Sequence, residues 1–254
     1  MIQNLGVVGT GLVGASVGMR GRAAGASVVG CDTNRDALAR ALARGAIDEE
    51  ASRDEVYGGC DTIVIALPPE AACAELRRLS GTPARWRLLI DVASVKRVIM
   101  KAAQGVARFV GTHPLAGAEA SGPECADATL FEGRTWCYVP SGDAELDARV
   151  AGLITMLGAA PLSVTAEEHD ATLAVTSHLP QMVAWLLAAK IRSKGVESER
   201  FCGPAGLEVL RLARSSPALW NEILQANADN VGAAARALAA ELTAWRGVDE
   251  GNRP

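Results

Sequence analysis

With 254 residues, 49% of them hydrophobic, the chain can bury the core of one large domain or of two modest ones. Its formal net charge of -4, with no basic stripe, excludes a nucleic-acid partner. Six scattered cysteines, none in a C-x-x-C pair, and only three histidines exclude a disulfide framework and a metal site. The longest strongly apolar stretch, residues 182–189, is too short to span a bilayer, so we expect no membrane contact and a cytoplasmic protein.

The first predicted strand, residues 5–8, leads directly into the segment Gly9-Thr10-Gly11-Leu12-Val13-Gly14. Helical spacing follows this segment, and residues 26–31 predict a second strand that ends at Asp32, 18 residues after Gly14. A Gly-x-Gly-x-x-Gly loop between a strand and a helix, with an acid at this distance, is typical of a dinucleotide site. The pattern therefore predicts a bound dinucleotide, with Leu12 and Val13 in the first helical turn beside it.

Each glycine of this loop has a separate task in such a site. Gly9 allows the tight turn, Gly11 lets the main chain approach a pyrophosphate, and Gly14 lets the helix lie close to the strand. The helix N-terminus offers free N–H groups and the positive end of a dipole to the phosphates. Asp32 is expected to bind the ribose hydroxyls and repel a 2′-phosphate, which favours NAD over NADP, whereas Arg35 weakens this preference.

Two further strands, residues 61–67 and 88–92, are predicted after a helix over 36–43, and a helix over 71–79 lies between them. The first strand is broken by Pro68-Pro69, and its end places Ala66 and Pro68 beside the cofactor. Ser94 follows the second strand and is open to two interpretations. It is either the N-cap of a helix from residue 95 or a group that faces the nicotinamide. Lys96 is interpreted as a solvated charge in the first helical turn.

His113 stands in the segment that carries the most specific signal of the chain. Residues 107–110 predict a buried strand, Pro114 ends it, and His113 is therefore expected at the mouth of the sheet. An imidazole there suits proton transfer near neutral pH. A buried histidine hydrogen-bonded at a strand end is the alternative.

The alternation of strands and helices continues with a strand over 135–139 and a helix over 143–157, and stops near residue 165. Thr165-x-x-Glu168 is a capping box that opens an apolar helix reaching residue 191. Helices over 204–213, 217–227 and 231–245 complete the chain. The predicted fold is an α/β Rossmann-type dinucleotide-binding domain over 1–164, followed by an all-helical domain over 165–254. Its apolar faces are expected to pack on a second subunit, which predicts a homodimer.

Blocks spread along nearly the whole chain resemble the prephenate and arogenate (cyclohexadienyl) dehydrogenases of tyrosine biosynthesis. The blocks are the glycine loop, residues 91–96, residues 111–134, His169-Asp170, Ser177-His178-Leu179-Pro180, Leu210-Arg211-Leu212-Ala213 and Ser216-Pro217-Ala218-Leu219-Trp220. The resemblance implies an NAD(P)-dependent oxidative decarboxylation of a small carboxylate substrate. Hydride leaves ring C4 for the nicotinamide, the ring carboxylate leaves as carbon dioxide, and the ring becomes aromatic.

The resemblance also assigns roles to single residues. His113 falls on the catalytic histidine, and Ser94 falls on a serine that bridges the substrate hydroxyl, the histidine and the cofactor. Arg211 falls on the arginine that holds the ring carboxylate, and His178 falls on a second histidine of the substrate pocket, with a core histidine as the alternative. Lys190 stands where many relatives place a substrate-reading histidine, with a surface lysine as the alternative.

The chain departs from the family pattern before Arg211, where an aromatic-Arg-Asp triplet is replaced by Gly206-Leu207-Glu208. Glu208 retains the carboxylate, so the departure concerns the side-chain end of the substrate more than the reaction. One alternative is a dehydrogenase of 4-amino-4-deoxyprephenate, and another is a β-hydroxyacid or imine reductase. A non-catalytic NAD-sensing dimer is the alternative from a different class, although a sensor would need only the first half of the chain.

Overall fold

A six-stranded parallel sheet forms the centre of the first part of the molecule. The computed structural model describes residues 3–117, 122–195 and 197–245, and the predicted segment 111–134 therefore has its residues 118–121 outside the described part. The strands stand in the order β3-β2-β1-β4-β5-β6. Their bounds are β1 Asn4–Val8, β2 Ser27–Cys31, β3 Glu49–Glu50, β4 Thr62–Ile65, β5 Leu88–Asp91 and β6 Phe109–Val110. This order is that of the Rossmann fold, so the predicted fold class is confirmed.

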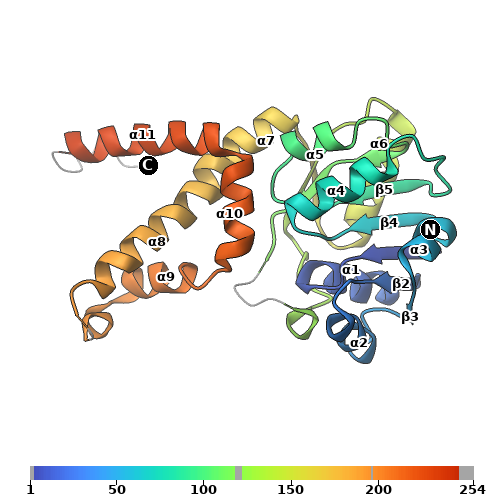
Figure 1. Cartoon of the computed structure of the whole chain (residues 1–254), viewed down its shortest axis with the longest axis horizontal. Coiled ribbons are helices and arrows are strands. Elements are labelled where there is room, and N and C mark those ends of the chain that lie inside the picture. The colour runs from blue at the N-terminus through green and yellow to red at the C-terminus, as the bar shows by residue number, and fades with distance from the viewer. Residues whose placement is uncertain (1–2, 118–121, 196, 246–254) are drawn as a thin grey trace.

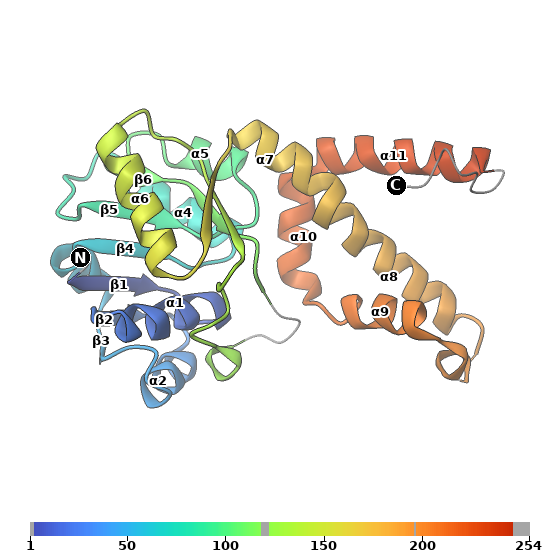
Figure 2. The ribbon, with the colours of Figure 1, turned by 180° about the vertical axis from the view of Figure 1, so that it is seen from behind.

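Helices cover both faces of this sheet, which is why the residues of β4 and β5 are all buried. One face packs against α1 (Leu12–Ala23), α2 (Arg35–Ala43) and α6 (Ala144–Met156) (Figure 2). The opposite face packs against α3 (Arg53–Gly59), α4 (Pro69–Leu79) and α5 (Arg97–Ala102) (Figure 1). The sequence patterns predict neither α3 nor the two-residue strand β3, because such short elements carry too few apolar residues for a periodic signal.

A second, three-stranded sheet carries His113 and corrects one expectation. It consists of β7 (Thr112–Pro114), β8 (Thr135–Tyr138) and β9 (Ala160–Ser163), with β7 antiparallel to β8. His113 therefore does not end a strand of the main sheet; it lies inside β7, opposite Cys137. The chain leaves the main sheet after Val110, and the Asp91 carboxylate accepts a hydrogen bond from the Thr112 N–H at 2.9 Å. Pro114 is tolerated as the last residue of an edge strand.

The second part of the chain is helical. It contains α7 (Ala166–Leu173), a π-helical segment η2 (Ala174–His178), α8 (Leu179–Arg192), the 3-10 turn η3 (Ser198–Phe201), α9 (Pro204–Leu212), α10 (Pro217–Ala226) and α11 (Ala228–Ala244). The predicted capping box at Thr165 and Glu168 is confirmed. In Figure 1, α8 and α11 extend away from the α/β part, and α10 lies on the side that faces α4. No helix within the described residues is long and apolar enough to cross a membrane.

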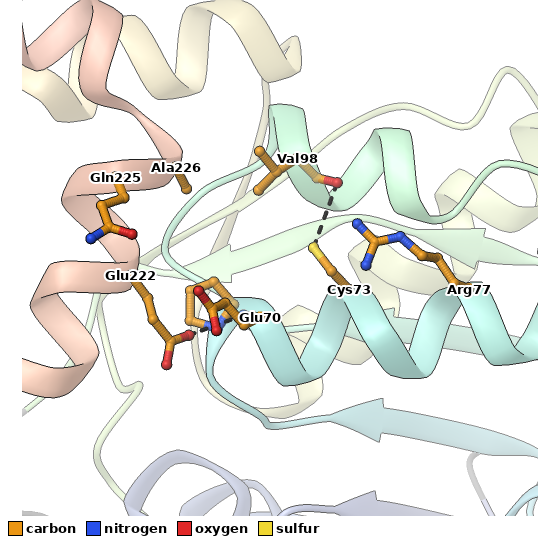
Figure 3. Close-up of a pocket in the computed structure, with 8 residues that line it drawn as sticks. Glu70, Cys73, Arg77, Val98, Glu222, Gln225 and Ala226 are labelled. Atoms are coloured by element: carbon orange, nitrogen blue, oxygen red, sulfur yellow. Dashed lines mark hydrogen bonds between the residues drawn. The ribbon is translucent and has the colours of Figure 1, made fainter.

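The two parts meet along α4, α5 and α10. The Glu222 carboxylate of α10 accepts a hydrogen bond from the Glu70 N–H at the start of α4, at 3.0 Å. A pocket of about 480 Å³ lies between these helices, with Cys73 and Val98 on its α/β side (Figure 3). A stronger link is Arg97, whose guanidinium reaches Asn227 and Asp229 at the start of α11. The helical part is thereby anchored at the carboxyl edge of the main sheet.

Candidate active site

The segments that follow β1, β4 and β5 leave the main sheet at the same edge. Val8 pairs with Ile65, and Ile65 pairs with Asp91, so the three strand ends lie side by side. The glycine loop, residues 66–68 and the Ser94 loop therefore line one edge in this order. In open parallel sheets this carboxyl edge is where ligands bind.

The glycine loop forms an open cradle in front of α1. Gly9 has φ of 95°, and a Cβ atom there would come within 2.4 Å of the Ala66 carbonyl oxygen. A Cβ atom on Gly14 would lie 1.9 Å from the Gly9 carbonyl oxygen, whereas one on Gly11 would meet nothing within 4 Å. The first turn of α1 carries neither an acidic residue nor a side-chain cap. These features leave space and free N–H groups for an anionic ligand such as a pyrophosphate.

Asp32 lies directly after β2, next to the glycine loop. One oxygen of its carboxylate accepts from the Thr10 N–H at 2.7 Å, and the other accepts from the Asn34 N–H at 2.8 Å. The side chain is thus fixed at the edge of the cradle by main-chain donors. Arg35 opens α2 nearby, and its side chain is 81% exposed, with the guanidinium 4.0 Å from the Glu50 carboxylate.

A buried ion pair joins the Ser94 loop to β7, and it corrects the interpretation of Lys96. Lys96 is not solvated; its side chain and that of Asp91 are both 0% exposed and are paired. The Lys96 ammonium also donates to the Thr112 carbonyl oxygen. The Asp91 carboxylate accepts from the N–H groups of Ala93 and Thr112. Burial lowers the pKa of Lys96, and the Asp91 charge opposes that shift.

Because α5 begins at Arg97, the interpretation of Ser94 as a helix N-cap is wrong. The main-chain N–H groups of Lys96 and Arg97 instead donate to the Asp170 carboxylate, at 2.7 and 2.9 Å. Ser94 is left partly exposed in the loop between β5 and α5.

His113 is partly exposed on β7, and its ring contacts a second imidazole. Its Nδ1 atom lies 2.9 Å from Nε2 of His169, and His169 Nδ1 lies 2.8 Å from the Asp170 carboxylate. Desolvation lowers the pKa of His113 well below 6.5, and electrostatic interactions with His169, Lys96 and His178 lower it further. His113 is therefore neutral at physiological pH, which is the state that can accept a proton.

His178, which the resemblance places in the substrate pocket, is 1% exposed. Its Nδ1 atom lies 3.1 Å from the Asn227 side-chain nitrogen, and the ring also hydrogen-bonds the main chain of Ser94. Burial lowers its pKa to about 4, although the Asp170 charge opposes this. The ring edge faces Trp220 at 6.1 Å between centroids. These contacts hold the Ser94 loop against the helical part.

The remaining site candidates lie farther along the helical part. Arg211 and Glu208 form an ion pair on α9, at 2.7 Å between Nε and the carboxylate, and both are exposed. The end of α9 is tied to α8 by Gln181, which donates to the Leu212 carbonyl oxygen. Lys190 is exposed near the far end of α8. It stands 12 residues beyond His178, or about 18 Å along a helix.

Four residues that assemble this site carry no assigned role in the sequence patterns: Arg97, His169, Asp170 and Asn227. Asn227 donates to the Asp170 main-chain oxygen and accepts from Arg97. The small number of histidines could have pointed to His169, because all three histidines of the chain lie together at this site. Contacts between residues so far apart in the sequence leave no local pattern.

Two family models match the chain, and together they cover most of it. The model described as "Prephenate dehydrogenase, nucleotide-binding domain" matches residues 17–160. The model described as "Prephenate dehydrogenase, dimerization domain" matches residues 165–248.

Individual relatives agree with these matches. A probable prephenate dehydrogenase, NovF of Streptomyces niveus, is 34% identical over 259 residues, covering 97% of this chain and 70% of the relative. The prephenate dehydrogenase of Bacillus subtilis is 31% identical over 240 residues, which cover 89% of this chain but only 64% of the relative. The crystal structure of prephenate dehydrogenase from A. aeolicus with hydroxyphenyl propionate and NAD+ has a TM-score of 0.87 and 27% identity, covering 96% of this chain and 89% of that chain.

Proposed function

Because the chain belongs to the prephenate dehydrogenase family, we propose that it catalyses the NAD-dependent oxidative decarboxylation of prephenate or arogenate. The observation that carries this proposal is the neutral, partly exposed imidazole of His113 at the carboxyl edge of the sheet, joined through Asp91 to the loop that bears Ser94. The open glycine cradle stands at the same edge.

The glycine cradle fits NAD. The space in front of Gly11 admits a pyrophosphate, and the uncapped N-terminus of α1, with Leu12 and Val13 in its first turn, offers N–H donors. Ala66 and Pro68 follow the adjacent β4 at the same edge of the sheet and would contact a bound NAD. The cofactor supplies the hydride acceptor. The side chains of the protein position the substrate, bind its carboxylate and transfer its proton.

His113 accepts the proton of the C4 hydroxyl as hydride leaves ring C4. Loss of the ring carboxylate as carbon dioxide then returns a pair of electrons to the ring, and the resulting phenolate oxygen takes the proton back from His113. The histidine is thus regenerated in each turnover. Ser94, partly exposed in the neighbouring loop, bridges the substrate hydroxyl and the cofactor.

Arg211 binds the ring carboxylate, since a planar guanidinium can hold a carboxylate with two hydrogen bonds. Glu208 orients this guanidinium through the ion pair on α9. His178 is a positioning residue that holds the Ser94 loop, because the ring is buried and is hydrogen-bonded to Asn227 and to Ser94. The exposed Lys190 side chain of a second subunit contacts the outer end of the substrate cleft.

The direct test is turnover, followed at the absorbance band of reduced nicotinamide. The protein is mixed with NAD and with prephenate, arogenate or 4-amino-4-deoxyprephenate in parallel. We expect signal with prephenate or arogenate. Signal with the amino analogue alone contradicts the substrate assignment, and binding of NAD without turnover of any of the three contradicts the enzyme assignment.

Replacing Asp32 with serine is expected to shift the ratio of kcat/KM for NADP to that for NAD by about 10²-fold toward NADP. The carboxylate no longer repels the 2′-phosphate, and the exposed Arg35 side chain can approach it. The measurement is steady-state kinetics with each cofactor. A matched Asp32→Ser, Arg35→Ala double variant should lose part of the gain with NADP, and an unchanged ratio in the single variant would place the adenosine ribose elsewhere.

The pH profile of kcat/KM is expected to stay flat from neutral pH downward past 6.5 and to fall only in more acidic solution. The base must be neutral, and the pKa of His113 is lowered below 6.5 by desolvation and then by His169 of α7, Lys96 of the Ser94 loop and His178 of η2. Protonation of the ring therefore removes activity only as the pH falls through this lowered pKa. An acidic limb centred at or above 6.5 would contradict the assignment of His113 as the base.

The helical part also supports a homodimer, in agreement with the description of its family model as a dimerization domain. Large apolar side chains are exposed on it: Leu186 61%, Leu187 45%, Phe201 89%, Leu207 55% and Leu242 64%. A second copy that covers them would bury apolar surface of the kind found in obligate interfaces. Residues 1–164 then form the cofactor domain and residues 165–254 the substrate and dimer domain of a cytoplasmic enzyme, whose six cysteines are free thiols.

A further inference from the structure

His113 is the end of a chain of three hydrogen-bonded side chains that starts at the buried Asp170. The Asp170 carboxylate lies 2.8 Å from His169 Nδ1, and His169 Nε2 lies 2.9 Å from His113 Nδ1. The two rings meet edge to face, with their planes at 67°. His169 and Asp170 are 2% and 0% exposed, so water does not compete for these hydrogen bonds. The ionised state of Asp170 therefore determines which ring nitrogen of His169, and then of His113, carries a proton.

Asp170 can only accept hydrogen bonds. One of its oxygens accepts from the Lys96 N–H, and the other accepts from the N–H and the guanidinium of Arg97. Burial alone would raise the pKa of Asp170, but hydrogen bonds from His169, Arg97 and Lys96 hold it below its ordinary value. The carboxylate is thus ionised, and His169 must carry its proton on Nδ1.

A neutral His169 with its proton on Nδ1 presents a lone pair at Nε2. Among the residues that the structure describes, His113 Nδ1 is the atom that faces this lone pair, at 2.9 Å, so it must carry a proton and donate it. The proton of neutral His113 is consequently on Nδ1, and its Nε2 atom is bare. We propose that His169 and Asp170 are positioning residues that fix this tautomer of His113, so that Nε2 is the atom that takes the substrate proton. This inference rests on the proposed function of His113 as the base.

The arrangement explains how the base works in both directions. When Nε2 accepts the hydroxyl proton, the ring becomes an imidazolium whose Nδ1–H still donates to His169, and the Asp170 charge stabilises it through His169. When the phenolate forms, the same Nε2–H bond breaks and the neutral tautomer is restored. A His169 protonated on both nitrogens would instead donate to His113 Nδ1, and His113 would hold its proton on Nε2 and be unable to act as a base.

The chain of contacts also crosses the boundary between the two parts of the molecule. His113 belongs to β7, whereas His169 and Asp170 belong to α7, 56 positions along the chain from His113 to His169. The contacts of Asp170 with Lys96 and Arg97 clamp α7 to the Ser94 loop. The tautomer of the base is thereby set only when the helical part is docked on the cofactor domain.

The tautomers can be read directly from the imidazole 15N chemical shifts of the full-length protein, because the chain has only three histidines. We expect His113 and His169 with the proton on Nδ1 at neutral pH. His178 is an internal control of the opposite kind, because its Nδ1 accepts from the Asn227 amide and its proton is on Nε2. The variant His113→Asn assigns the His113 signals. A His113 with its proton on Nε2 would overturn the proposal, whether or not the protein turns over any substrate.

Two substitutions of His169 test the consequence for catalysis. His169→Gln keeps an oxygen that can accept from His113 Nδ1, and we expect its kcat within about tenfold of the wild type. His169→Phe keeps the ring but removes the acceptor, and we expect kcat to fall by about 10²–10³-fold, with the dissociation constant of NAD unchanged and His113 partly in the other tautomer. Equal kcat for both variants and the wild type would overturn the proposal. Absence of turnover in the wild type contradicts the proposed function instead and leaves the 15N assignment as the test of the tautomer.

Discussion

The variant His113→Asn is expected to lower kcat by about 10²–10⁴-fold and to leave NAD binding intact, because general base catalysis by a positioned side chain contributes a factor of this size. Asparagine retains an N–H donor near the position of Nδ1, so the hydrogen bond to His169 and the local packing survive. It has no nitrogen that can take a proton near neutral pH. The loss should therefore fall on the chemical step.

Three measurements separate this effect from misfolding. Single-turnover kinetics with prephenate or arogenate report the chemical step, fluorescence titration reports the dissociation constant of NAD, and thermal unfolding reports stability. NAD binding should not change, because the glycine cradle belongs to β1 and α1, whereas His113 belongs to β7. Turnover at the wild-type rate would show that this histidine is structural.

The variant Asp91→Asn is expected to lower the free energy of unfolding by about 3–5 kcal/mol, because it leaves the buried Lys96 ammonium without a counter-charge. The asparagine NH₂ group also faces donors only, since the Asp91 carboxylate accepts from Ala93, Lys96 and Thr112. Typical domains are stable by only about 5–15 kcal/mol, so this loss is a large fraction of the total. Because Asp91 holds Thr112, the neighbour of His113, kcat should fall as well.

Urea unfolding of matched variants checks this prediction. Asp91→Asn combined with Lys96→Met removes both charges and should recover part of the stability, since no uncompensated charge stays buried. The control is Glu145→Gln, which breaks the ion pair with Arg149 on the exposed side of α6 and should change stability by less than about 1 kcal/mol. A loss for Asp91→Asn as small as that of the control would show that the buried pair does not stabilise the fold.

The parts of the protein that follow from the sequence are those decided over a few neighbouring residues. The glycine loop needs glycine at positions 9 and 14 because Cβ atoms there would meet main-chain oxygens, and this requirement is local. The capping box at Thr165 uses atoms three residues apart. Continuous apolar runs predict β4 and β5, because a strand that helices cover on both faces is apolar along its whole length. The fold class and the geometry of the glycine loop were therefore predictable.

The environment of the base depends on contacts between segments far apart in the chain. The neighbouring residues in the sequence predict that Lys96 is a solvated surface charge. In the fold, β7 packs against it, and its side chain is fully buried and paired with Asp91. The resemblance leaves His178 open as a substrate contact or a core histidine, and Asn227, between α10 and α11, lies against its ring, which is 1% exposed. Desolvation and charge act through space and carry no periodic signal along the sequence. The packing of the helical part on the α/β part therefore joins His113 to His169 and Asp170, and the tertiary structure as a whole lowers the pKa of His113.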